Sequence, residues 1–91
     1  MRLLYKTVTG DAQLVPGECY LMGVELTHST DDILILYDEP TSDKSAARKV
    51  TTLRTSGEQL DVSRKWPYPG VKCNGIYADW TGGVGTIYYY L

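Results

Sequence analysis

Histidine and cysteine are the residues that most readily build a nucleophilic or metal-bound centre, and both are scarce in this chain. His28 is the only histidine, and Cys19 and Cys73 are the only cysteines. Three such side chains can hold zinc, but structural zinc sites pair their ligands at short spacing, and these three are far apart in sequence. Glu25 and His28 have the Glu-x-x-His spacing of metal-binding bundles, which converges on one face only in a helix. We therefore expect no metal site and no catalytic histidine.

Carboxylates gather around two predicted loops, and glycines around a third. The acids lack the spacing of an EF-hand, so we interpret them as solvated turn residues, not as a calcium site. The Gly-Gly-Val-Gly segment at 82–85 lacks the Gly-Lys-Ser/Thr ending and the following helix of a phosphate-binding loop. We expect no cofactor, no catalytic residue and no enzyme activity. The acids in question are Asp31, Asp32, Asp38, Glu39 and Asp43.

Length and charge narrow the classes of protein further. The 91 residues fit one domain, spanning 1–91, and 43% of them are hydrophobic, as in globular proteins. The net charge of −2 argues against a nucleic-acid partner, which normally requires a basic stripe. No apolar run is long enough to cross a bilayer, so we expect no membrane partner.

The two cysteines have two possible roles. Residues 1–6 lack the apolar run of a signal peptide, which favours cysteines that are small, buried and unpaired. Cys19 and Cys73 could also meet across a sheet, and whether they form a disulfide stays open at this stage.

Short segments rich in β-branched and aromatic residues, separated by turn signals, must position any site. They predict an all-β fold: a small antiparallel β-sandwich or barrel of about seven short strands with no substantial helix. The long apolar run 33–37 predicts a central strand. The glycines at 82–83 predict a hairpin between the last two strands. The predicted strands are 3–9, 18–27, 33–37, 49–55, 75–80 and 84–91, with a looser stretch at 12–15 and a weaker one at 58–63.

One predicted strand, 18–27, specifies a core face by alternation. Tyr20, Met22, Val24 and Leu26 share one side of it, and we expect that side to face the core. Gly23 interrupts the other side, where it indicates close packing or a bulge.

The aromatic content is unusual, with eight tyrosines, two tryptophans and no phenylalanine. Large rings with polar tips suit surfaces that become buried on association, although tyrosine is also common in ordinary sheets. The stiff segment 66–70 (Trp-Pro-Tyr-Pro-Gly) either presents rings to a neighbour or forms a lid over the open end of the sandwich. The candidate interface residues are Trp66, Tyr68, Tyr77, Trp80, Tyr88, Tyr89 and Tyr90.

Four segments give the chain a family resemblance. They are similar to strands of small virion proteins of tailed bacteriophages, in which a terminal Gly-Ile-Tyr hairpin ends in paired tyrosines. The chain departs from that pattern at 66–70 and at Trp80. The segments are 20–24, 35–38, 74–82 and 84–90.

The resemblance implies a virion structural protein, assembled in the host cytoplasm, that acts as a capsid decoration or cement subunit. Its expected partners are the major capsid protein or other virion proteins and further copies of itself. A neck, tail or fibre component is the nearest alternative. A carbohydrate-binding module is a second one, since Trp66, Tyr68, Tyr77 and Trp80 could stack on sugar rings.

Overall fold

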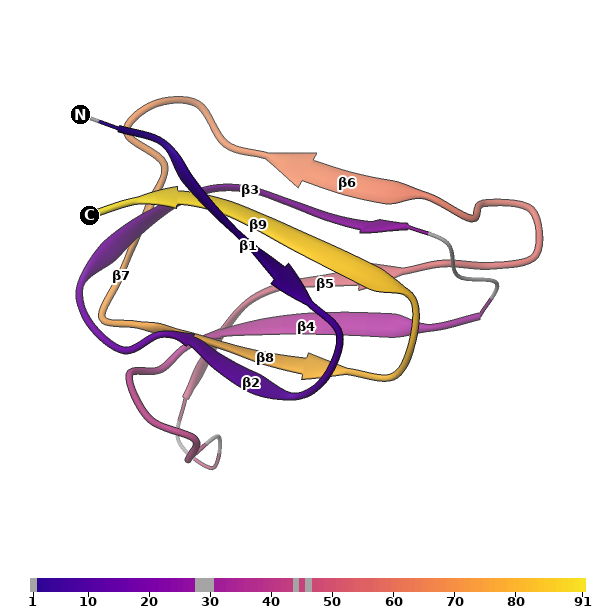
Figure 1. Cartoon of the computed structure of the whole chain (residues 1–91), viewed down its shortest axis with the longest axis horizontal. Coiled ribbons are helices and arrows are strands. Elements are labelled where there is room, and N and C mark those ends of the chain that lie inside the picture. The colour runs from indigo at the N-terminus through magenta and orange to yellow at the C-terminus, as the bar shows by residue number, and fades with distance from the viewer. Residues whose placement is uncertain (1, 28–30, 44, 46) are drawn as a thin grey trace.

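The computed structural model describes residues 2–27, 31–43, 45 and 47–91, and it contains two antiparallel sheets packed face to face. Figure 1 shows the two sheets as the upper and lower groups of strands, with no helix in the described part of the chain. The predicted all-β sandwich is therefore confirmed. The described residues form nine strands where the sequence predicts about seven. Two short edge strands account for the difference: residues 62–65 were predicted only as part of a weak segment at 58–63, and residues 71–73 were not predicted.

The first sheet, sheet A, has the order β1-β9-β3, and both β6 and β7 pair with the outer side of β3. β6 lies against residues 23–26 of β3 and β7 against residues 19–21, so two short strands share one edge. Pro67 and Pro69 lie between them and cannot donate to a ladder, which explains why the edge strand is split. The strands are β1 (Leu4–Val8), β3 (Cys19–Thr27), β6 (Val62–Lys65), β7 (Val71–Cys73) and β9 (Val84–Tyr90).

The second sheet, sheet B, has the order β2-β8-β4-β5. β4 lies between β8 and β5, which confirms the predicted central strand. Arg48 forms an ion pair of 3.1 Å with Asp38 where β4 and β5 meet at one end. The strands are β2 (Ala12–Val15), β4 (Ile33–Asp38), β5 (Arg48–Arg54) and β8 (Ile76–Trp80).

One hydrophobic core fills the space between the two sheets. The central strands β4, β8 and β9 bury alternate residues over most of their length, as expected for strands with one face toward a core. The fully buried members come from both sheets, so the core holds them together by burial of apolar surface. The largest of them are Leu21, Leu26, Leu34, Leu36, Ile76 and Ile87.

The predicted core face of β3 is only half right. Val24 and Leu26 are buried, but Tyr20 and Met22 are only partly buried, and Leu21 is buried in their place. The register of β3 against β9 shifts between Leu21 and Gly23. A bulge of one residue reverses which side chains face the core, so alternation fails across it. The bulge that Gly23 indicated is therefore present.

The predicted hairpin between the last two strands is wrong. β8 belongs to sheet B and β9 to sheet A, so residues 81–83 carry the chain from one sheet to the other. Both strands bury alternate residues in the same core, and they can do so only by facing each other across it. The amide of Thr81 donates to the carbonyl of Ile33, which holds the crossover against β4.

Candidate functional site

Three tyrosine rings form a stack at one end of sheet A, here called the aromatic column. Tyr20 and Tyr90 are cross-strand neighbours on β3 and β9, with ring centroids 5.1 Å apart. Tyr68, from the loop between β6 and β7, stacks on the other face of Tyr90 at 5.9 Å. The interplanar angles of 18° and 17° show nearly parallel rings. Segments far apart in the sequence thus join in one rigid aromatic unit.

The loop at 66–70 anchors this column. The Tyr90 hydroxyl donates a 2.6 Å hydrogen bond to the Pro69 carbonyl, and the Trp66 amide donates to the Met22 carbonyl at 3.0 Å. The pKa of Tyr90 is raised above its usual value, mainly because the ring is buried and secondly because Tyr68 lies beside it. The loop therefore covers Tyr90 on the outer side of sheet A, while the outermost ring, Tyr68, remains 73% exposed.

Two of the seven candidate interface residues are not available to a partner. Tyr89 is 6% exposed and Tyr90 5% exposed within the single chain. Tyr89 faces the core between the sheets, and the loop at 66–70 covers Tyr90. The single chain therefore covers both of these rings without a second molecule.

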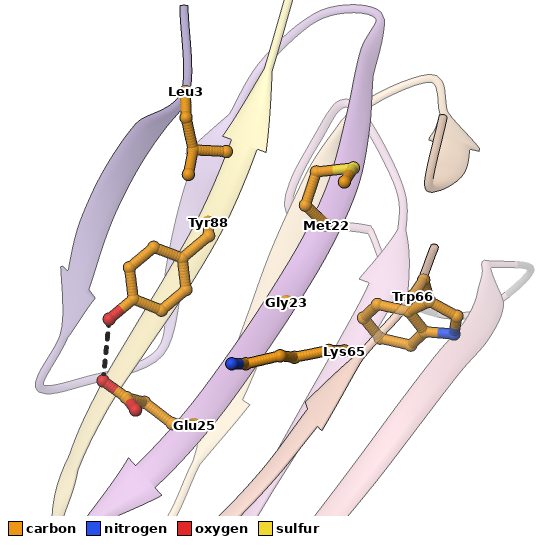
Figure 2. Close-up of a pocket in the computed structure, with 7 residues that line it drawn as sticks. All are labelled: Leu3, Met22, Gly23, Glu25, Lys65, Trp66 and Tyr88. Atoms are coloured by element: carbon orange, nitrogen blue, oxygen red, sulfur yellow. Dashed lines mark hydrogen bonds between the residues drawn. The ribbon is translucent and has the colours of Figure 1, made fainter. Parts of the chain in front are cut away.

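The outer face of sheet A also contains a groove of about 430 Å³. Its floor is the backbone of β3 at Gly23, and Figure 2 shows Tyr88 on one side of this glycine and Trp66 on the other. A methyl group at Gly23 would touch the Tyr88 ring at 3.7 Å, so the missing side chain keeps the groove open. The lining residues are Leu3, Met22, Gly23, Glu25, Lys65, Trp66 and Tyr88.

Two charged residues lie at the lower end of this groove in Figure 2. Tyr88 donates a hydrogen bond of 2.9 Å to Glu25, and this bond raises the pKa of the Tyr88 phenol. Lys65 extends into the groove from β6. The groove thus combines apolar walls with one carboxylate and one ammonium group.

The remaining candidate rings lie on the other sheet. Tyr77 and Trp80 belong to β8 of sheet B, and the Trp80 indole donates to the Gly83 carbonyl at 3.0 Å. Trp66 and Tyr68 follow β6 of sheet A. The four rings that a sugar platform would need are therefore divided between two sheets.

The cysteines are paired in register but are not joined. Cys19 on β3 lies directly opposite Cys73 on β7, and both are free and buried. Burial, reinforced by the nearby carboxylate of Asp38, raises the pKa of Cys19 to about 11 and that of Cys73 to about 12. Both thiols are therefore protonated at neutral pH, a state that disfavours nucleophilic attack.

Within 2–27, 31–43, 45 and 47–91, no three histidine, cysteine or carboxylate side chains are grouped to hold a metal ion. His28 lies outside the described residues. In that same part of the chain, no helix is long and apolar enough to span a membrane. Comparison with protein-family models, curated proteins and solved structures found no match.

Sequence reasoning missed part of the groove. Leu3, which lines the groove and directly precedes β1, is 58% exposed, and Tyr5 on β1, the neighbour of Tyr88, is 71% exposed. A usable signal was the spacing of Leu3 and Tyr5, which places two large side chains on one face of the predicted strand 3–9. The pairing of Glu25 with Tyr88 could not be foreseen, because it depends on the register of β3 against β9.

Proposed function

We propose that the chain is a non-catalytic structural subunit of a virion, of the capsid decoration or cement type, which binds the shell through the exposed end of the aromatic column. The observation that carries this proposal is the placement of Tyr68, which is 73% exposed yet stacked on Tyr90. A ring held in place before binding loses little conformational entropy on docking.

The chemistry of docking supports the same role. Aromatic anchors contribute much of the binding energy at protein interfaces, and tyrosine is among the most frequent of them. Two of the three rings of the column, Tyr20 and Tyr90, belong to β3 and β9 in the centre of sheet A. A force applied to Tyr68 is therefore transmitted to the centre of the sheet. A subunit that strengthens a shell needs such a stiff contact. The resemblance to small phage virion proteins points to the major capsid protein as the partner.

The test is binding to expanded capsid shells of the virus that encodes the chain. The wild-type chain is expected to cosediment with the shells and to raise their melting temperature. Tyr68→Ala should weaken binding about tenfold or more, as expected for loss of an aromatic anchor. Leu60→Ala is the matched control, because Leu60 is also exposed, at 46%, but precedes β6 and lies outside the column.

Two results would contradict this proposal. Absence of wild-type binding to shells would exclude the decoration role, and binding to isolated necks, tails or fibres would then identify the virion component. Equal binding by wild type and Tyr68→Ala would show that the column is not the docking point. The melting temperature of each free variant serves as the control for folding.

A further inference from the structure

The groove face of sheet A is apolar where a sheet exposed to solvent is usually polar. Tyr5 is the cross-strand neighbour of Tyr88, and both lie on the outer side of the sheet. Leu3 lines the groove and is 58% exposed. A contiguous apolar surface of this kind marks an interaction site.

The charges in the groove indicate what would cover it. Lys65 pairs in register with Gly23, and Glu25 lies two residues further along β3, so the acid and the base are diagonal neighbours on one face. The structure gives neither of them an ion-pair partner in the described part of the chain. A uniformly acidic or basic partner would place a like charge against one of them and would be disfavoured.

We propose that this groove face is the interface between two copies of the chain related by a two-fold axis. An axis lying between the two faces, midway between Glu25 and Lys65, places each Glu25 opposite the Lys65 of the other copy. Such an isologous contact uses the same patch twice and forms both ion pairs at once. The apolar walls around Leu3 and Tyr5 are buried in the same step.

The groove lies beside the aromatic column on sheet A but uses other side chains, and dimer formation can be tested with the chain alone. Analytical ultracentrifugation of the wild type is expected to show a monomer–dimer equilibrium. Lys65→Glu and Glu25→Lys should each raise the dimer dissociation constant at least about tenfold, because each creates two like-charge contacts. A mixture of the two variants restores both opposite-charge pairs, so it should form heterodimers that neither variant forms alone.

Controls separate this result from damage to the fold. Lys49→Glu reverses a charge on β5 of the opposite sheet and should leave the dimer unchanged. The double replacement Leu3→Ser with Tyr5→Ser removes exposed apolar groups and should weaken the dimer without unfolding the monomer. A wild type that stays monomeric, or that forms trimers, would overturn the proposal. So would a dimer unaffected by the charge reversals, or a mixture of the two variants that fails to associate.

Discussion

Two buried threonines at one edge of sheet B should respond in opposite directions to the same substitution. Thr51 on β5 is 6% exposed, and its hydroxyl has no hydrogen-bond partner in the described part of the chain. Thr55, just beyond β5, is 4% exposed, and its hydroxyl accepts from the Asp32 amide at 3.0 Å. Valine has nearly the same shape as threonine, so Thr51→Val and Thr55→Val differ mainly in the fate of one hydroxyl.

The expected magnitudes follow from that difference. Removing an unsatisfied buried hydroxyl should stabilise Thr51→Val by about 1 kcal/mol, since leaving a buried polar group unpaired costs about 1–3 kcal/mol. Thr55→Val should lose about 1–3 kcal/mol, because it removes the acceptor of the Asp32 amide. For a domain of this size, each kcal/mol corresponds to roughly 4–8 °C in melting temperature.

The assay is urea unfolding at neutral pH, with both variants compared with wild type. An unchanged dependence on urea concentration would show that the denatured state is the same in all three proteins. The reasoning would be refuted if Thr51→Val were destabilised, or if both variants changed stability by the same amount. A destabilised Thr51→Val would mean that the Thr51 hydroxyl has a hydrogen-bond partner. Equal changes in both variants would mean that the hydrogen bond from the Asp32 amide to Thr55 does not contribute to stability.

Three further predictions concern the loop at 66–70, the cysteines and the column. Gly70→Ala should lower the free energy of unfolding by at least about 1–3 kcal/mol, measured by urea unfolding. Gly70 has a φ of 86°, and an added Cβ would lie 2.5 Å from a main-chain oxygen of β3. A variant as stable as wild type would contradict this. Cys19 and Cys73 should resist alkylation at pH 8 in the folded chain and react on unfolding, because burial raises both pKa values; rapid labelling of the native chain would disprove it. The pKa of Tyr90 is higher in the folded chain than its value near 10 in the unfolded chain. The protonated phenol therefore stabilises the fold at pH values below 10, and this contribution is lost as the pH rises through the pKa of the folded state. Tyr90→Phe should therefore lose stability less steeply than wild type above pH 10 in a pH series of unfolding curves, and identical slopes would count against the column.

Local sequence patterns predicted most of the fold, because strands and turns depend on neighbouring residues. The apolar run of β4 indicated its central place, and the two prolines at 67 and 69 excluded a regular strand there. Alternation failed in β3, where the bulge at Gly23 exchanges the faces. The pairing of β8 and β9 failed too, because a short glycine turn fits a hairpin and a crossover between sheets equally well.

The candidate site was predictable in its residue types but not in its arrangement. The sequence singled out Tyr68 and Trp66 as stiff aromatic groups, and both line surfaces of sheet A. The burial of Tyr90 depends on a hydrogen bond to Pro69, twenty-one positions away, which no local pattern encodes. The groove likewise requires the register of three strands, and register emerges only when the whole sheet forms.

A reconstruction of expanded shells saturated with the wild-type chain would test the central claim most directly. The account predicts density for a two-sheet domain on each shell, oriented so that Tyr68 and the loop at 66–70 contact the capsid protein. Shells that remain bare at saturating concentrations, or a bound domain whose Tyr68 faces solvent, would contradict it.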